Sequence, residues 1–319
     1  MSKVVITDYT FPDLSIETQI LEAAGLEVAS GQCKTQQELV TLVADADYVI
    51  TQFAPIDEDV IKSMPNCKVI VRYGIGYDNV DCEAAKENGI PVCNIPTYCI
   101  DEVADHTLSF ILSMTRQLLA NAKYVQNGEW GLGTDLSNMR GLYDSTVGIV
   151  GLGRIGQAVA ERLQGFGCRL IAYDPVVNPT QISNIGCQLV GLDYLLSNSD
   201  IITLHCPSLP STKNIINNST LLKMKKGSLL VNAGRGDLIC ADALTEALIT
   251  GHLAGAAIDV FSTEPIPADS PLLNMDNVLI TSHIASASPQ STRTLRETAA
   301  QIVVISTKGE PLPNIVNGL

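Results

Sequence analysis

Short apolar runs alternate with amphipathic segments along most of the 319-residue chain. Over residues 1–100, the apolar runs predict strands at 3–7, 27–29, 48–52, 68–72 and 91–93. Between these runs, apolar residues recur at helical spacing and predict helices at 14–24, 36–44, 57–63 and 81–88. Strands and helices that alternate in this way form a parallel sheet with helices on both faces.

The same alternation returns after residue 146. Strands are expected at 147–150, 169–173, 200–205, 228–232, 255–260 and 278–281. Helices are expected at 155–163, 192–196, 217–223, 241–250 and after Pro289. A long amphipathic helix from Asp101 to about Val125 joins the two halves. The polar, glycine-rich segment 127–144 is interpreted as a surface loop in which Trp130 serves packing.

The run 146–174 carries the most specific chemical signal. A buried strand leads into the G-x-G-x-x-G turn at 151–156, and then a helix and a second strand follow. This order, with an acid about twenty residues on, is typical of dinucleotide binding. Gly151 permits the tight turn, Gly153 lets backbone approach a pyrophosphate, and Gly156 lets the helix pack close to the strand. The helix N-terminus adds unpaired N–H groups for the phosphates.

Asp174 ends the second strand and indicates which dinucleotide is bound. Its carboxylate can accept hydrogen bonds from the adenine-side ribose, but it would repel a 2′-phosphate. At an effective dielectric near 20, two unit charges about 4 Å apart repel by ~4 kcal/mol. The next four residues contain no Arg that would offset this repulsion. The sequence therefore predicts NAD as the cofactor.

Composition narrows the class of protein. With 20 basic and 34 acidic residues, the net charge is −14, which argues against nucleic-acid and anionic-membrane partners. The chain has no signal-peptide pattern and no apolar run of the ~20 residues that span a bilayer. Nine cysteines, without a C-x-x-C pair, fit reduced thiols in a cytoplasmic protein. None of the four histidines has metal-ligand spacing with another, so no metal is expected.

Ionisable residues follow several of the predicted strands, at the edge where open α/β sheets bind ligands. Arg72 enters a Gly-flanked turn, and Arg235 stands between two glycines, where its fork suits a carboxylate. Glu264 and His283 come after two later strands. A carboxylate clamp, a proton donor and an acid beside it are what reduction of a 2-keto acid requires.

At this point a family resemblance is evident. The sequence resembles the D-isomer-specific 2-hydroxyacid dehydrogenases over essentially its whole length, in the runs 71–81, 102–108, 147–156, 230–237, 257–265 and 282–285. The resemblance implies that Arg235, Glu264 and His283 are catalytic and that Asp259 holds the nicotinamide carboxamide. It further implies cofactor contacts at Thr107, Arg154, Ile155, Cys206, Pro207, Thr212 and Ala233. The turn that receives the substrate carboxylate is then Arg72, Tyr73, Gly74 and Ile75.

The resemblance also implies the architecture: two doubly wound parallel-sheet α/β domains with a cleft between them. A Rossmann cofactor domain is expected at 101–288, and a flavodoxin-like substrate-binding (lid) domain at 1–100 and 289–319. A homodimer is expected, with the helix from Asp101 and the segment 127–144 as candidate interface.

Several alternatives remain open from the sequence. Hydroxypyruvate, glyoxylate, 3-phosphoglycerate and larger keto acids are all candidate substrates. Arg72 is the one evident basic residue for a phosphate, and small residues follow His283, where many relatives carry a Trp or a Gly pair. Glu264 argues against formate dehydrogenase activity, because those relatives carry Gln there. The rival function is an NAD(H)-sensing protein similar to the C-terminal-binding-protein corepressors. His106, His205 and His252 are interpreted as structural.

Overall fold

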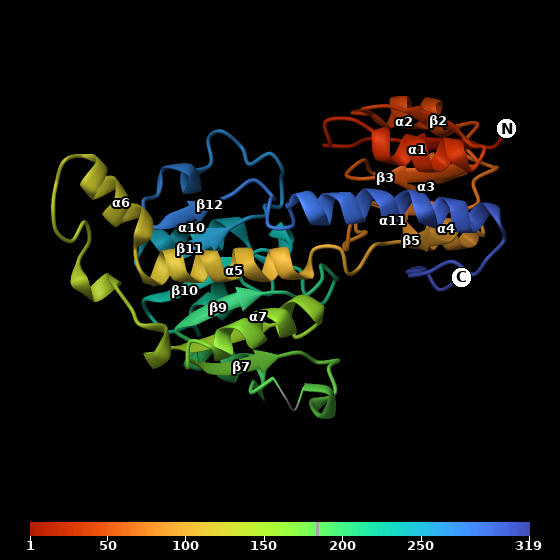
Figure 1. Cartoon of the computed structure of the whole chain (residues 1–319). Helices are drawn as coiled ribbons and strands as arrows, with labels where there is room; N and C mark the ends of the chain where they lie inside the picture. Colours follow the sequence, from red (N-terminus) through yellow and green to blue (C-terminus); the bar gives the residue numbers. More distant parts are fainter. Residues whose placement is uncertain (183–184) are drawn as a thin grey trace. The chain divides into compact units, whose positions relative to one another are not determined.

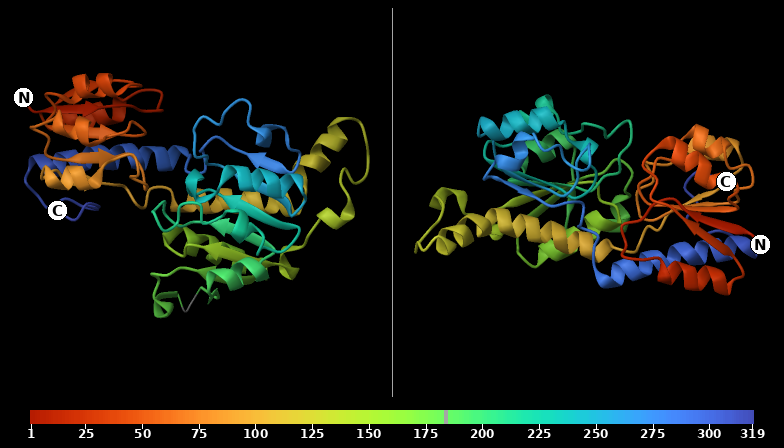
Figure 2. Two further views of the ribbon diagram at one scale, coloured as in Figure 1. Left: turned by 180° about the vertical axis from the view of Figure 1, so that it is seen from behind. Right: turned by 90° about the horizontal axis from the view of Figure 1, so that it is seen from above.

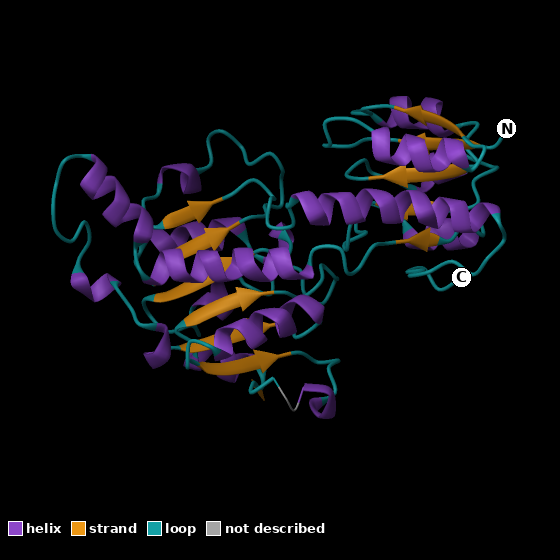
Figure 3. Ribbon diagram, viewed as in Figure 1, coloured by secondary structure: helices purple, strands orange, loops and turns teal. Residues whose placement is uncertain are grey.

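The computed structural model describes residues 1–182 and 185–319, and its chain forms two compact units. Unit 1 comprises Met1–Tyr98 and Ser288–Leu319, and unit 2 comprises Cys99–Ala287. Each unit is built of strands layered between helices (Figure 1, Figure 3). Among the described residues, no helix is both long and apolar enough to cross a membrane.

Unit 1 contains a parallel sheet in the order β2-β1-β3-β4-β5, which is the flavodoxin-like order. Its strands are β1 (Lys3–Ile6), β2 (Glu27–Ser30), β3 (Tyr48–Thr51), β4 (Ile70–Arg72) and β5 (Val92–Cys93). Its helices are α1 (Ser15–Ala23), α2 (Gln36–Val43), α3 (Glu58–Lys62), α4 (Cys82–Glu87) and α11 (Pro289–Thr307). The five strands predicted from the sequence are confirmed, and their ends shift by no more than two residues.

The alternation of side chains along these strands gives unit 1 two apolar faces. Val5, Val49 and Ile70 pack with α2, α3 and α4. Val4 and Ile50 point to the opposite face, where they pack with α1 and α11. The C-terminal helix therefore covers one face of a sheet that the N-terminal segment forms. Local signals set the helix starts: Thr35 forms a capping box at α2, while Asp57 and Asp81 cap α3 and α4.

Unit 2 contains a parallel sheet in the order β12-β11-β10-β9-β6-β7-β8. The strands are β6 (Thr146–Val150), β7 (Arg169–Tyr173), β8 (Gln188–Leu189), β9 (Ile201–Leu204), β10 (Ser228–Asn232), β11 (Leu253–Ile258) and β12 (Val278–Ile280). The strand order reverses between β6 and β9, as in dinucleotide-binding Rossmann folds. Both units confirm the α/β class with two parallel sheets. The edge strand β8 was not predicted.

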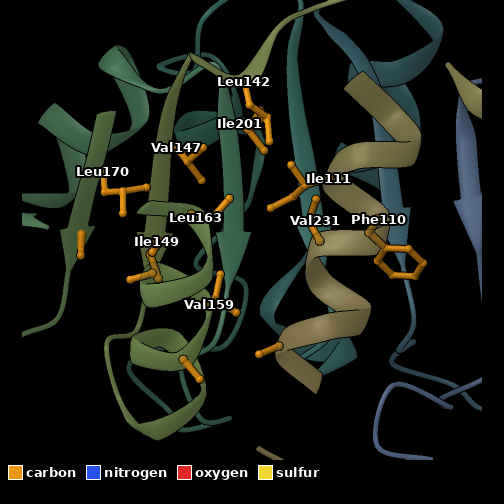
Figure 4. Packing of buried hydrophobic residues seen from close by; sticks show 14 of the residues in the cluster. Phe110, Ile111, Leu142, Val147, Ile149, Val159, Leu163, Leu170, Ile201 and Val231 are labelled. Carbon is orange, nitrogen blue, oxygen red and sulfur yellow. The ribbon is translucent and has the colours of Figure 1, made fainter. Parts of the chain in front are cut away.

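Helices cover both faces of this second sheet. One face carries α5 (Ile100–Thr115) and α7 (Arg154–Gln164), whose Ile111 and Val159 pack with Ile149 and Val231 of the sheet (Figure 4). The other face carries α8 (Leu192–Asn198), α9 (Asn218–Leu221) and α10 (Ala241–Ile249). The helices occupy the two faces of the sheet, and the candidate functional site lies at the carboxyl ends of its strands.

The predicted long helix is wrong in one respect, because the structure divides it in two. Gln117 adopts a left-handed conformation with φ of 51° and separates α5 from α6 (Leu118–Gln126). No residue of α6 is buried. Trp130 is 91% exposed, so it does not pack within this chain. The helix α6 and the first part of the segment 127–144 extend away from the sheet of unit 2 (Figure 1, Figure 2). The segment contains two short 3-10 turns at Leu136–Asn138 and Leu142–Asp144, and it returns to the sheet at Leu142, which is buried in the core.

Candidate active site

The glycine turn lies at the carboxyl end of β6, where the strand order reverses. A Cβ on Gly151 would lie 2.4 Å from the backbone nitrogen of Cys206, and one on Gly156 would lie 2.2 Å from the carbonyl oxygen of Gly151. By contrast, nothing lies within 4 Å of the Cβ position of Gly153, so the turn is open at this point. The turn is therefore crowded at Gly151 and Gly156 but open at Gly153. The N-terminus of the eleven-residue helix α7 follows it, and together they fit a dinucleotide pyrophosphate.

Asp174 follows β7 and is fixed beside the glycine turn. Its Oδ2 accepts the N–H of Leu152 at 2.8 Å, and its Oδ1 accepts the N–H groups of Val176 and Val177 at 2.8 and 3.1 Å. The carboxylate therefore braces the turn and stands where the sequence analysis places the ribose hydroxyls.

The other residues expected to line the cofactor lie in different surroundings. Arg154 is exposed in the first turn of α7, Ile155 beside it is half-buried, and Ala233 is half-buried after β10. Cys206 backs Gly151, and burial raises the pKa of its thiol to about 11. Thr212 accepts the N–H of Leu209 at 2.8 Å and donates to the Pro207 carbonyl at 2.6 Å, which closes that loop. Thr107 is fully buried in α5, and its hydroxyl donates to the Val103 carbonyl at 2.8 Å.

His283 and Glu264 form a close pair at the carboxyl edge of unit 2. Nδ1 of His283 lies 2.7 Å from Oε2 of Glu264, and Oε1 accepts the N–H of Phe261 at 2.9 Å. Partial burial favours the neutral form of Glu264. The hydrogen bonds from His283 and Phe261 and the charges of His283 and Arg235 outweigh burial, and they hold the pKa of the Glu264 carboxyl below its ordinary value. Glu264 is therefore an anion beside a histidine.

Arg235 is placed by the turn that follows β10. Asn232 donates from Nδ2 to the Arg235 carbonyl at 2.8 Å and accepts the N–H of Gly234 at 3.0 Å. A Cβ on Gly236 would lie 1.9 Å from the carbonyl carbon of Phe261, so this turn packs directly on the segment that leads to Glu264. The structure thus brings the Arg235 turn to the His283–Glu264 pair.

Asp259 has contacts that the sequence did not reveal. It is 1% exposed, and its carboxylate accepts the hydroxyl of Thr281 and the N–H groups of Ile284 and Ala285. Its backbone carbonyl accepts the N–H of His283 at 2.8 Å. The resemblance assigned Asp259 to the cofactor, and the structure shows that it also anchors the turn that carries His283.

The substrate turn expected from the sequence lies in unit 1. Arg72 is buried: its Nη1 donates to the Tyr73 carbonyl at 2.8 Å, and its guanidinium lies over the ring of Phe53. Tyr73 is 1% exposed and donates its hydroxyl to Glu17 at 3.0 Å. Both side chains turn inward, in contrast to the expectation that Arg72 adds positive charge for an anion at this turn. The turn is held through Gly74 and Ile75, whose carbonyls accept the Ile95 N–H and the Asn94 amide.

A Rossmann-type sheet with an open glycine turn, and an Arg–Glu–His group on the same edge, defines a dinucleotide-dependent oxidoreductase. The model of the D-isomer specific 2-hydroxyacid dehydrogenase NAD-binding domain matches residues 108–285. The chain belongs to the D-isomer-specific 2-hydroxyacid dehydrogenase family. It is an NAD-dependent oxidoreductase of D-2-hydroxy acids, as the sequence analysis predicts.

Individual relatives agree with this assignment. A hydroxypyruvate reductase from Blautia hydrogenotrophica is 36% identical, and the match covers 99% of this chain and 100% of the relative. A D-3-phosphoglycerate dehydrogenase from Methanocaldococcus jannaschii is 38% identical over 99% of this chain, which spans only 60% of that relative. The structure of a D-lactate dehydrogenase from Aquifex aeolicus with NAD and lactic acid superposes with a TM-score of 0.90, at 30% identity and 99% coverage of both chains. These relatives give the corepressor alternative no support.

Proposed function

We propose that this protein reduces a small, non-phosphorylated 2-keto acid to its D-2-hydroxy acid with NADH. In this proposal His283 is the general acid, Glu264 stabilises its protonated form, and Arg235 binds the substrate carboxylate. The 2.7 Å contact between His283 and Glu264, beside the Arg235 turn, is the observation that carries the proposal.

The chemistry follows from these contacts. Bound NADH supplies the hydride to the carbonyl carbon of the substrate. Because Nδ1 of His283 is held by Glu264, Nε2 is the atom that delivers the proton to the carbonyl oxygen. Arg235 orients the substrate through two parallel hydrogen bonds to its carboxylate. In the reverse direction the neutral His283 removes the hydroxyl proton.

We assign cofactor binding to unit 2 and substrate recognition to unit 1. The open glycine turn and Asp174 support the first assignment. For the second, we assign to the main chain of the turn 73–75 a contact with the substrate in addition to that of Arg235, because the side chains of Arg72 and Tyr73 are engaged inside unit 1.

The contacts of Arg72 also bear on the choice of substrate. Its guanidinium is buried against Phe53 and the Tyr73 carbonyl, so it is poorly placed to bind a substrate phosphate. The hydroxypyruvate reductase that matches over both full lengths points the same way. We therefore favour hydroxypyruvate or glyoxylate over phosphorylated acids.

NADH oxidation followed at 340 nm tests this proposal. The panel is pyruvate, hydroxypyruvate, glyoxylate, phenylpyruvate, 2-ketoisocaproate and phosphohydroxypyruvate, each repeated with NADPH. Turnover of hydroxypyruvate or glyoxylate well above that of phosphohydroxypyruvate supports the assignment, and a preference for phosphohydroxypyruvate contradicts it. Tight NADH binding without turnover of any acid would instead favour the sensor function.

We further propose that the protein acts in the cytoplasm as a homodimer. Large apolar side chains gather, exposed, on α6 and the segment 127–144: Leu118, Leu119, Val125, Trp130, Leu132, Leu136 and Tyr143. Such a patch is typical of an interface. Nine free cysteines suit a reducing compartment. Light scattering of the wild type should give twice the mass of one chain, and Trp130→Ser with Leu136→Ser should give monomers; a monomeric wild type would contradict the proposal.

A further inference from the structure

His283 is held in a backbone conformation that its residue type disfavours. Its φ is 57°, in the left-handed region where a residue with a Cβ is strained. Such a conformation persists only where neighbouring groups over-determine it. The direction in which the imidazole points therefore depends on whatever fixes this turn.

Asp259 fixes the turn by accepting three backbone hydrogen bonds. Its backbone carbonyl accepts the N–H of His283 at 2.8 Å. Its carboxylate accepts the N–H groups of Ile284 and Ala285, both at 2.9 Å, on Oδ1 and Oδ2 respectively. The orientation of this one buried carboxylate therefore sets the path of the chain immediately after His283, while the backbone of Asp259 holds His283 itself.

Two side chains outside the catalytic group control that carboxylate. Thr281 donates its hydroxyl to Oδ1 of Asp259 at 2.5 Å. Since the hydroxyl proton is committed to Asp259, the Thr281 oxygen accepts from Nε2 of His106, which lies 3.2 Å away. The same Nε2 is 3.9 Å from Oδ1 of Asp259. His106 therefore carries a hydrogen on Nε2.

His106 is itself fixed by the helix to which it belongs. It lies in α5, and its ring meets the ring of Phe110, one turn further along, edge to face at a centroid distance of 4.4 Å. Phe110 is buried in the core of unit 2 (Figure 4). The hydrogen-bonded series from His106 through Thr281 to Asp259 thus connects the rigid core to the turn at His283.

We propose that His106 and Thr281 are positioning residues, which act through Asp259 to hold the left-handed turn that aims the His283 imidazole at the substrate. This inference rests on the proposed role of His283 as general acid. It assigns a function in catalysis to a histidine that the sequence analysis interprets as structural.

Thr281 offers a matched pair of variants. Thr281→Val keeps the shape and removes the hydroxyl, whereas Thr281→Ser keeps the hydroxyl. Because the lost hydrogen bond is to a charged group and small misplacements of a catalytic group are costly, Thr281→Val should lower kcat by about tenfold to a hundredfold. Thr281→Ser should keep kcat within about threefold of wild type, since the donor to Asp259 is retained. NADH affinity, measured by fluorescence titration, should change less than kcat in both variants.

His106 allows the same comparison at the next hydrogen bond of the series, the bond from His106 to Thr281. His106→Asn retains an N–H donor and His106→Leu does not, so His106→Leu should show the larger fall in kcat, about threefold to tenfold. Combined with Thr281→Val it should add little, because His106 acts on Asp259 through the Thr281 hydroxyl, which that variant already lacks. His252→Leu is the control: it removes a histidine of unit 2 that bonds the Leu221 carbonyl, and it should leave kcat unchanged.

These outcomes separate the inference from the proposed function. One outcome is that kcat falls strongly in His283→Ala but stays at the wild-type value in Thr281→Val and His106→Leu. This result would overturn the inference and would still support the proposed function. Equal kcat in the Val and Ser variants, with only a lower melting temperature, would also overturn it, because a merely structural role predicts that result. Unchanged kcat in His283→Ala would overturn the proposed function itself.

Discussion

Nδ1 of His283 lies 2.7 Å from Oε2 of Glu264, and the other oxygen of that carboxylate is held by the N–H of Phe261. The acid is therefore fixed by the backbone and in turn fixes the imidazole. Removing the imidazole should remove the proton donor and little else. We expect His283→Ala to lower kcat by about a hundredfold to ten-thousandfold, the usual scale of general acid–base catalysis. Steady-state kinetics with the preferred acid measures this change, and NADH titration provides the control.

Glu264→Gln should change the pH dependence of the reaction. The amide keeps the approximate shape but cannot stabilise an imidazolium. Reduction of the keto acid requires the protonated form, and the alkaline limb of the kcat profile should therefore move to lower pH. Because the pKa of Glu264 is below its ordinary value, this carboxyl stays ionised over the range of the measurement. Profiles that superpose from pH 5 to 9 would contradict this role of Glu264.

Asp174→Ala should affect the two cofactors unequally. In NADH binding the change removes a hydrogen-bond acceptor for the ribose. In NADPH binding it also removes a repulsion of ~4 kcal/mol at an effective dielectric near 20. NADH affinity should therefore fall more than NADPH affinity. Both should suffer from the loss of the brace on the Leu152 N–H. Fluorescence titrations measure the ratio, and an unchanged ratio would place Asp174 away from the ribose.

The buried Glu17–Arg296 pair should matter strongly for stability. Glu17 is fully buried and accepts from Arg296 at 2.7 and 2.8 Å. Glu17→Ala removes the buried anion, leaves the guanidinium with only the exposed carboxylate of Asp13, and should destabilise the protein by about 3–5 kcal/mol. Glu17→Leu combined with Arg296→Met should cost less than either single change, because neither charge is then orphaned. Urea unfolding of Glu17→Leu, Arg296→Met and the double variant tests this ordering, and that of Glu17→Ala tests the magnitude.

His205 should make the protein sensitive to mild acid. Its burial beside Thr203 at the end of β9 lowers the pKa of the imidazole to about 4 from its ordinary 6.5. Between these values the unfolded chain binds a proton that the folded chain does not, so stability falls as the pH is lowered from 6.5 towards 4. The loss should be roughly 2–3 kcal/mol, since one pKa unit is about 1.4 kcal/mol. His205→Gln should flatten this dependence relative to wild type and to His252→Gln, as urea unfolding at several pH values would show.

Local signals explain why so much of the fold could be predicted. Thr35, Asp57 and Asp81 cap the helices they precede, and apolar runs of period two or 3.6 mark the elements. The break at Gln117 carries no such signal, because neither Gly nor Pro is present and the residue adopts a left-handed conformation regardless. The two-residue edge strand β8 is too short to show a period.

The candidate site likewise contains residues that could be found from the sequence and contacts that could not. Gly151, Gly153 and Asp174 could be found from the sequence because their roles depend on neighbours close along the chain. The inward orientation of Tyr73 could not, since its partner Glu17 is 56 residues away. The link of His106 to Thr281 spans 175 residues and has no periodicity or motif that would reveal it. Contacts of this kind are created by tertiary structure alone.

Arg296 follows Glu17 by 279 residues, although the two are salt-bridged within one unit. At about 5–20 residues per second, a ribosome needs roughly 14–56 s to synthesise the intervening chain. Throughout that interval the nascent N-terminal segment lacks α11. The apolar face that contains Val4 and Ile50 is therefore not yet covered by that helix. Unit 2, which is continuous, emerges in full before that helix does. The part of the enzyme that is translated first is therefore the last to complete its fold, because one apolar face of its sheet must wait for α11.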